Sequence, residues 1–353
     1  MPKTIKKIIK VTVIVILGFF LIHMPLTTPI AYEAFFLSRY ETPDWLEYSL
    51  SDFDGLMMER SDFSSGKNTL AGYKYSSGSN NAKGVVVIAH GMGGGGHNQF
   101  LPYIDYFTDA GYYVFAYDAT GNDASEGKNV RGLPQGLIDL DNALTHLKTL
   151  PEYRDLPIVL FGHSWGGYSV GNVLEFHPDV SAAAIVAGFN ESEDMISFHA
   201  GRFVGPFVYI GLPYVDAYER IKFGNKYATT SALDAMGSTE AGIMMIQGGV
   251  DTTVPAECGY DKVYAAYSGN ERFEFVFYPD REHKYIFYSD EAYEYIKELE
   301  AEYMQYIKAT GKKNNARTRN EFLEENLDAS AKFNINPDLA ERLVSFYDKY
   351  CIN

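Results

Sequence analysis

The chain has 353 residues, of which 46% are hydrophobic, and a formal net charge of −16 at pH 7. This length and composition suffice for one domain with a large buried core. The negative charge would repel phosphates, which argues against nucleic-acid binding and against adsorption of the body to an anionic membrane. No His, Cys and Asp residues have the spacing of metal ligands, and we expect neither a metal nor a cofactor.

The N-terminal segment is typical of membrane targeting. Four lysines precede an uncharged apolar run, Val11–Ile22. Only Pro29 and Ala31 form a cleavage site after it, and a poor one, so we expect residues 1–31 to be an uncleaved anchor in the cell membrane. The lysines would lie inside and the catalytic domain outside. A cleaved signal peptide and a secreted protein are the alternative, because the strictly apolar run is short for a spanning helix.

Strand and helix patterns alternate along the next 250 or so residues, about the size of one ordinary domain. Ranges 52–60 and 69–75 are expected to be leading antiparallel strands. Leucines recur at steps of three and four over 133–147, which predicts an amphipathic helix that packs on the sheet. The alternation predicts an α/β fold with a mostly parallel, doubly wound sheet. The further strands are expected at 84–89, 112–117, 157–161, 182–187, 242–247 and 272–278.

The apolar strand at 84–89 runs into His90-Gly91-Met92-Gly93-Gly94-Gly95-Gly96. Glycines allow the backbone to approach a substrate carbonyl and to point N–H groups at the oxygen that becomes negative during acyl transfer. We assign these two donors to the backbone amides of Met92 and Trp165. His97, after the glycines, could face the pocket or only begin the next helix.

The pentapeptide Gly162-His163-Ser164-Trp165-Gly166 follows the strand at 157–161 and precedes a predicted helix, Trp165–Phe176. A serine on a sharp turn between strand and helix exposes its hydroxyl, and side chains two residues away would crowd the strained backbone. The pattern predicts that Ser164 is a nucleophile. The alternative is a structural serine in a hydrolase that has lost its activity.

A serine hydroxyl needs a base and an orienting acid. Asp251 follows the strand at 242–247, and His283 follows the strand at 272–278. We expect Asp251 to be the acid and His283 the base. A capping role for Asp251 and the nearby Asp280 are the alternatives for the acid.

The alternation lapses over 190–241, which we expect to be a cap over the pocket, rich in aromatic residues and with Gly201, Gly205 and Gly211 as hinges. After His283, the range 290–309 is expected to be the closing helix of the domain, and 311–353 a C-terminal helical extension packed on it. Cys258 and Cys351 could form a disulfide or remain free thiols.

Over about residues 52–310 the chain resembles the α/β-hydrolase superfamily, and within it the serine aminopeptidase and monoglyceride-lipase-like branch. The resemblance rests on the His90 loop, the Ser164 pentapeptide, Gly249-Val250-Asp251, His283 and the loop 117–127, which has Asp123 where a glycine is usual. It implies a Ser164, His283 and Asp251 triad with a Met92 and Trp165 oxyanion hole. The aromatic cap, which would suit an apolar acyl chain, favours a small-molecule carboxylic ester or related acyl bond as the substrate. An aminopeptidase-like peptidase, with Glu191, Glu193 or Asp194 holding a substrate amine, and a catalytically silent binding protein are the alternatives.

Overall fold

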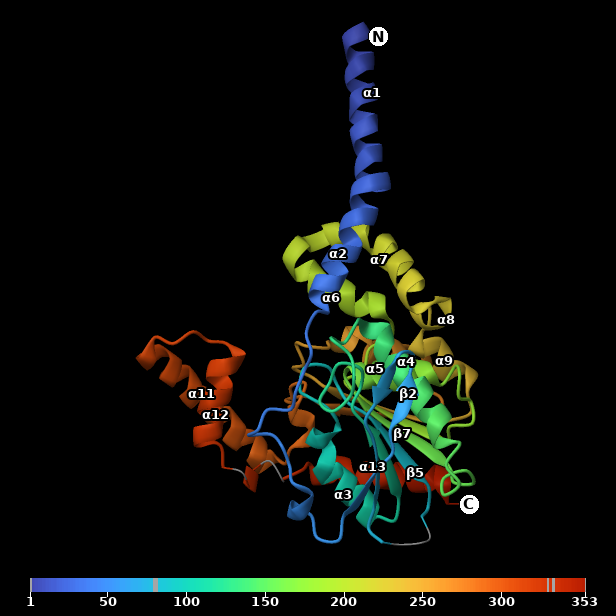
Figure 1. Cartoon of the computed structure of the whole chain (residues 1–353), viewed down its shortest axis with the longest axis vertical. Coiled ribbons are helices and arrows are strands. Elements are labelled where there is room, and N and C mark those ends of the chain that lie inside the picture. Colours follow the sequence, from blue (N-terminus) through green and yellow to red (C-terminus); the bar gives the residue numbers. More distant parts are fainter. Residues whose placement is uncertain (1, 79–81, 329, 332–333, 353) are drawn as a thin grey trace.

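The computed structural model describes residues 2–78, 82–328, 330–331 and 334–352 (Figure 1). Within these residues an eight-stranded sheet lies at the centre, in the order β1-β4-β6-β5-β7-β8-β9-β10. β1 pairs antiparallel with β4 and β4 with β6, whereas β6 to β10 run parallel, which confirms the expected fold class. The strands are β1 (Met57–Arg60), β2 (Phe63–Ser65), β3 (Asn68–Leu70), β4 (Gly72–Ser76), β5 (Val85–Ala89), β6 (Tyr113–Tyr117), β7 (Ile158–His163), β8 (Ala182–Val186), β9 (Gly242–Gly248) and β10 (Phe273–Tyr278).

Helices follow most strands and cover both faces of the sheet (Figure 1). The α-helices are α1 (Lys3–Gly18), α2 (Met24–Phe35), α3 (Leu101–Asp109), α4 (Leu133–Leu147), α5 (Trp165–Val173), α6 (Ser192–Val204), α7 (Val208–Phe223), α8 (Asn225–Ala228), α9 (Ala232–Ser238), α10 (Tyr260–Tyr267), α11 (Asp290–Thr310), α12 (Ala316–Asn326) and α13 (Pro337–Cys351). Shorter turns are the π-helical η1 (Phe19–His23) and the 3₁₀ turns η2 (Leu50–Asp52), η3 (His97–Phe100), η4 (Gly205–Phe207), η5 (Ala256–Cys258) and η6 (Tyr285–Phe287).

The first predicted strands are shorter in the structure. The expected strand over 52–60 is only β1, because the side chains of Ser49 and Asp52 cap a 3₁₀ turn before it. The expected strand over 69–75 is split at Ala71, whose N–H donates to Ser125 Oγ at 2.8 Å. β3 therefore turns back on β2 as a separate hairpin, which the sequence analysis did not predict.

Alternate residues of the central strands enter two different cores. Val85 and Val87 of β5 lie in the core that α4, α5 and α9 cover, whereas Val86 and Ile88 lie in the core that α3 and α13 cover. Because both faces of the strand are buried, all its positions are apolar. The leucines predicted to place α4 on the sheet are all buried in the first core.

The closing helix is α13, not the expected helix at 290–309. Leu339, Leu343 and Tyr347 of α13 are fully buried in the core on one face of the sheet, and Tyr347 Oη donates to the carbonyl oxygen of Leu160 at 2.8 Å. Instead, α11 packs with α12 around a small core of its own and the pair projects from the body (Figure 1). The reason lies in composition, since α11 alternates charged residues with tyrosines and buries only a narrow stripe.

Both cysteines are free thiols. Cys258 lies in the core beneath α4 and α5, and Cys351 packs against the core on the other face of the sheet. The sheet therefore separates the two sulfurs.

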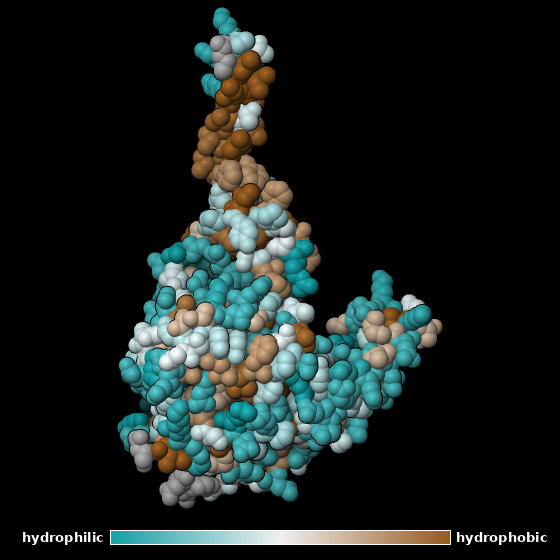
Figure 2. Space-filling model, turned by 180° about the vertical axis from the view of Figure 1, so that it is seen from behind, coloured by the Kyte–Doolittle hydropathy of each residue, from teal (hydrophilic) through white to brown (hydrophobic). Residues whose placement is uncertain are grey.

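The N-terminal elements α1, η1 and α2 form one helix, Lys3–Phe35, that is long and apolar enough to cross a membrane or to be a signal sequence. Its outer part projects from the molecule, with a hydrophobic surface and a hydrophilic free end (Figure 2). Its inner part, α2, packs on the cap helix α7.

Because α13 closes the core, truncation of its buried side chains should destabilise the whole domain. We expect Leu343→Ala to lower the free energy of unfolding by about 2–5 kcal/mol, since Leu343 is fully buried. The control is Met304→Ala on α11, where the side chain is 53% exposed and the change should stay within about 0.5 kcal/mol. Denaturant titration of both variants measures the difference, and equal losses would contradict the assignment.

Candidate active site

Ser164 stands between the end of β7 and the start of α5. Its backbone has φ 57° and ψ −115°, a left-handed conformation that is strained for a residue with a side chain. A Cβ on Gly162 would lie 2.4 Å from the carbonyl oxygen of Gly166, and a Cβ on Gly166 would lie 1.9 Å from that of Ala89. The close backbone contacts therefore exclude side chains at both positions, as the pentapeptide predicts.

The glycine loop after β5 lies against this turn. His90 Nε2 accepts the N–H of Ala119 at 2.8 Å, so His90 Nδ1 carries the proton and donates to the carbonyl oxygen of Gly91 at 2.8 Å. Burial lowers the pKa of His90, which favours this neutral form. A Cβ on Gly91 would lie 3.3 Å from the Cβ of Ser164. His90 thus shapes the loop rather than facing a substrate.

The two backbone amides assigned to the oxyanion hole belong to the residues that follow Gly91 and Ser164. Met92 is partly buried in the loop, and Trp165 is the first residue of α5, where a helix has no acceptor of its own for the N–H group. The indole of Trp165 is buried and donates to the carbonyl oxygen of Leu133 at 2.7 Å, which fixes the start of α5. The oxyanion role of these amides stays a prediction.

Asp251 and His283 contact each other directly. His283 Nδ1 donates to Asp251 Oδ2 at 2.7 Å, and Asp251 Oδ1 accepts the N–H groups of Thr253 and Val254 at 2.8 and 2.9 Å. The Asp251 side chain is completely buried. The Asp251 carboxylate therefore has both roles that the sequence analysis considered. Its Oδ1 caps the turn that follows Asp251, and its Oδ2 orients the imidazole of His283. Asp280, the rival acid, is exposed.

His163, the residue before Ser164, connects the serine to His283. Its Nε2 donates to the carbonyl oxygen of His283 at 3.2 Å, and the two imidazole rings lie 4.6 Å apart. Burial, followed by the nearby imidazole of His283, holds the pKa of His163 well below its usual range, so His163 stays neutral. In the described part of the chain no hydrogen bond joins Ser164 Oγ to His283. His163 links the two residues instead, because it directly precedes Ser164 and its side chain donates to His283.

These motifs coincide with a known family. A family model described as serine aminopeptidase, S33, matches residues 80–208, which include the glycine loop and Ser164. Among solved structures, an esterase from Pyrococcus furiosus superposes with a TM-score of 0.55 at 16% identity, over 86% of this chain and 96% of that chain. A second crystal form of that esterase gives a TM-score of 0.52 at 18% identity, over 74% of this chain and 94% of that chain.

The chain has the α/β-hydrolase fold, and its residues 80–208 match the serine aminopeptidase family model.

An acylaminoacyl peptidase from Pyrococcus horikoshii also matches, with a TM-score of 0.49 at 16% identity, over 67% of this chain and 38% of that chain. No curated protein sequence matches this chain. At such low identity the two esterase structures establish the fold of the chain and leave its activity and substrate open.

His97 and Asp123 hold loops in place. His97 Nδ1 and Asp118 Oδ1 lie 2.7 Å apart, and although burial opposes ionisation, His97 lowers the pKa of Asp118 to about 2. Asp123, which stands where the superfamily usually has glycine, accepts the N–H of Gly96 and that of Thr42, both at 2.6 Å. His97 begins η3 and is buried, so the helix-start alternative describes it.

The cap contains a buried carboxyl that the sequence analysis missed. Glu219 of α7 accepts hydrogen bonds from Tyr32 Oη at 2.6 Å and from Ser192 Oγ at 2.7 Å, which ties the N-terminal helix to α7 and α6. Burial raises the pKa of Glu219 to about 7, although the two hydroxyl donors oppose the shift. The only available signal was the polar pair Tyr32-Glu33 at the end of an apolar helix.

Of the glycines expected to be cap hinges, Gly201 lies within α6 and Gly211 within α7. Gly205 alone of the three stands at a break between helices, with φ 58°. Gly201 and Gly211 therefore do not stand at breaks between helices, and only Gly205 has the position expected of a hinge.

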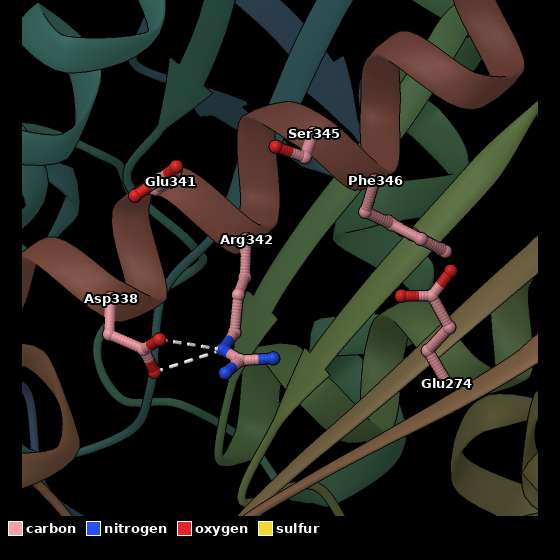
Figure 3. Close-up of a pocket in the computed structure, with 6 residues that line it drawn as sticks. All are labelled: Glu274, Asp338, Glu341, Arg342, Ser345 and Phe346. Atoms are coloured by element: carbon pink, nitrogen blue, oxygen red, sulfur yellow. Dashed lines mark hydrogen bonds and ion pairs between the residues drawn. The ribbon is translucent and has the colours of Figure 1, made fainter.

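Two cavities lie away from Ser164, Asp251 and His283. One, of about 410 Å³, lies on α13 and contains an ion pair between Arg342 and Asp338 at 2.9 Å (Figure 3). The other, of about 460 Å³, lies beside His97 and Asp118. Neither brings a nucleophile to a base, so we assign no chemistry to them.

The buried carboxyl of Glu219 gives the stability of the protein a distinctive pH dependence. Because folded Glu219 keeps its proton to about pH 7 and the unfolded side chain only to about 4.5, stability should be full below the lower value and fall as pH rises to the higher one. Glu219→Gln should flatten this fall, which amounts to about 1.4 kcal/mol for each unit of pKa shift. Thermal unfolding across this pH range, with the exposed Glu193→Gln as control, measures the slope, and an unchanged slope in Glu219→Gln would contradict the assignment.

Proposed function

We propose that this chain is a membrane-anchored serine hydrolase that cleaves carboxylic esters or related acyl bonds. The observation that carries the proposal is the hydrogen bond of 2.7 Å between His283 Nδ1 and Asp251. The buried Asp251 carboxylate accepts two further hydrogen bonds from backbone N–H groups, and it lies at the end of the sheet where the Ser164 turn stands. An imidazole held in this tautomer presents an unprotonated Nε2, which is the form that a general base needs.

In the proposed reaction Ser164 Oγ attacks the substrate carbonyl while His283 Nε2 takes the hydroxyl proton. Asp251 holds the imidazole and stabilises its charged form, and the amides of Met92 and Trp165 bind the oxyanion. His283 then protonates the leaving group, and water releases the acyl group from Ser164. Hydrogen bonds between nucleophile and base are often loose without substrate and tighten when it binds, which agrees with an unbonded Ser164 hydroxyl.

The peptidase alternative is weaker because two of the three acidic cap residues, Glu191 and Asp194, have other partners. The Glu191 side chain and Asp194 cap the start of α6, and Asp194 also pairs with Lys262 at 2.6 Å. A substrate amine would have to compete with these contacts. An ester, which has no amine to neutralise, needs no such group.

The anchor proposal is supported by the packing of the N-terminal helix. Phe20 and Met24, which lie within the segment that cleavage would remove, contact the cap. A cleaved signal peptide makes no such contacts with the mature protein. We therefore favour an uncleaved anchor with the catalytic domain on the outer face of the membrane.

An organophosphonate probe tests for a reactive serine. We expect the folded full-length protein to gain one adduct, detected by intact-protein mass spectrometry, because the probe traps a hydroxyl activated by a neighbouring base. Ser164→Ala should gain none. A folded wild type that stays unlabelled would instead support the catalytically silent binding protein.

The two candidate acids can be separated by kinetics. Asp251→Asn should lower kcat on nitrophenyl esters by roughly 10³–10⁴-fold, because the amide favours the wrong imidazole tautomer. Asp280→Asn, on the exposed rival, should leave kcat unchanged. Aminoacyl nitroanilides measured beside the esters decide the reaction class, and faster turnover of the anilides would favour the peptidase.

A further inference from the structure

The end of the cap that faces away from the sheet carries large apolar side chains on its surface. This end of the cap consists of the end of α6, the turn η4 and the start of α7. We call its exposed apolar residues the cap tip: Phe203, Val204, Phe207, Tyr209 and Ile210. Phe203 is 84% exposed, Phe207 72% and Tyr209 67%. No charged residue occurs in the range 203–215. These aromatic residues therefore neither fill the core nor line a cavity, and a contiguous apolar surface is typical of an interaction site.

The cap tip lies beside the N-terminal helix where that helix leaves the body (Figure 1). Tyr214 Oη donates to the carbonyl oxygen of Phe20 at 2.8 Å, and a Cβ on Gly211 would lie 3.8 Å from Met24 Cε. Both contacts come from the first half of α7. The apolar surface of the helix therefore continues directly onto the cap.

The length of the apolar helix determines how deep within a bilayer its contacts with the cap lie. No Asp, Glu, Lys or Arg lies between Lys10 and Glu33. The hydrocarbon core of a bilayer is about 30 Å thick and takes about 20 helical residues to cross. From Lys10 to Phe20 the helix rises only about 15 Å, at about 1.5 Å for each residue. A helix that spans the bilayer is thus still within the hydrocarbon where the cap contacts it.

The other end of the apolar span, at Glu33, lies where the cap makes polar contacts with the helix. The Glu33 side chain accepts a hydrogen bond from Tyr218 Oη at 2.5 Å and pairs with Lys222. Tyrosines and charged residues at the end of an apolar helix are typical of the membrane–water interface. From Lys10 to Glu33 the helix rises about 35 Å, close to the thickness of one bilayer core. The second half of α7 therefore lies at the interface and the cap tip on its hydrocarbon side.

We propose that the cap tip is inserted among the lipid acyl chains of the leaflet that adjoins the catalytic domain. Lipid fits this surface because the tip is apolar, carries no charge and continues an apolar helix of spanning length. The insertion completes the burial of a helix whose freely exposed part covers only half of the bilayer.

The insertion also specifies how the enzyme meets its substrate, an inference that rests on the proposed function. The cap lies between the N-terminal helix and the catalytic domain (Figure 1), in which Ser164 stands at the carboxyl end of β7. An ester with an apolar acyl chain, dissolved in the leaflet, lies at the cap without leaving the membrane. The substrate class is therefore a membrane-borne acyl ester rather than a freely soluble one.

Fluorescence quenching tests the insertion with the full-length protein in phosphatidylcholine vesicles that contain brominated acyl chains. Phe207→Trp should be quenched strongly, because bromine quenches only an indole that it contacts within the hydrocarbon. Met304→Trp on α11, a site of comparable exposure, is the matched control, and unsubstituted protein gives the background of Trp45 and Trp165. Quenching of Phe207→Trp equal to that of Met304→Trp would overturn the proposal, and crosslinking between cap tips of two copies would assign the surface to self-association instead.

Kinetics of the pair Phe203→Ser/Phe207→Ser test the substrate class. We expect at least about a tenfold loss of turnover on a long-chain nitrophenyl ester in vesicles, since two aromatic side chains no longer enter the lipid. Turnover of soluble nitrophenyl butyrate should be unchanged, and Ile221→Ser, which removes an exposed apolar residue beside Lys222, should affect neither. Equal effects on both esters would overturn the proposed class. If the wild type hydrolyses neither ester, the proposed function fails, and the quenching measurement still decides the insertion.

Discussion

The candidate active site depends on one backbone contact, the approach of the turn at Ser164 to the end of β5. Gly166 lies so close to the carbonyl oxygen of Ala89 that a Cβ there would be 1.9 Å from it. The Ser164 N–H donates to the carbonyl oxygen of Val186 at 2.8 Å, which ties the same turn to β8. The ends of three neighbouring strands are thereby held together. The left-handed conformation of Ser164 is strained, and it persists because these contacts leave the chain no alternative.

The second constraint acts on His283, which is held from two sides. Asp251 accepts its Nδ1 proton, and His163 donates to its carbonyl oxygen. The neutrality of His163 matters here, because a charged imidazole 4.6 Å away would disfavour protonation of His283. Burial provides that neutrality by holding down the pKa of His163. One residue of the pentapeptide thus positions the base while the next presents the hydroxyl.

The parts of the molecule that could be predicted from sequence are those fixed by local physics. β5 reads as a buried strand because all its residues are apolar, and the glycines around Ser164 reflect a steric demand visible within five residues. The contact of Asp251 with His283 was predicted because each follows a recognisable strand. The split at Ala71 was not, because it depends on the side chain of Ser125. Contacts between distant segments of this kind leave no local pattern.

Two further predictions differ from the structure, and the first could have been corrected by comparing two helical patterns with each other. The closing role was given to 290–309 by its position after His283, yet α13 has the broader apolar face, with Leu339, Leu343 and Tyr347 on one side. Comparison of the two faces would have favoured α13. The aromatic residues of the cap were expected over the pocket, yet Phe203, Phe207 and Tyr209 are exposed on the surface, and no local pattern distinguishes these two environments.

The cap connects the catalytic domain to the N-terminal helix, since it packs on both. The net charge of −16 would repel the body from anionic headgroups, so contact with a membrane must come from apolar surface. Tyr32 and Ser192 fix Glu219, and Lys222 pairs with Glu33, so the helix and the cap share polar contacts as well as packing. These contacts set the angle between the helix and the domain. In the proposed membrane arrangement, the spanning helix would set the height and orientation of the whole domain, and with them the distance from Ser164 to the lipid.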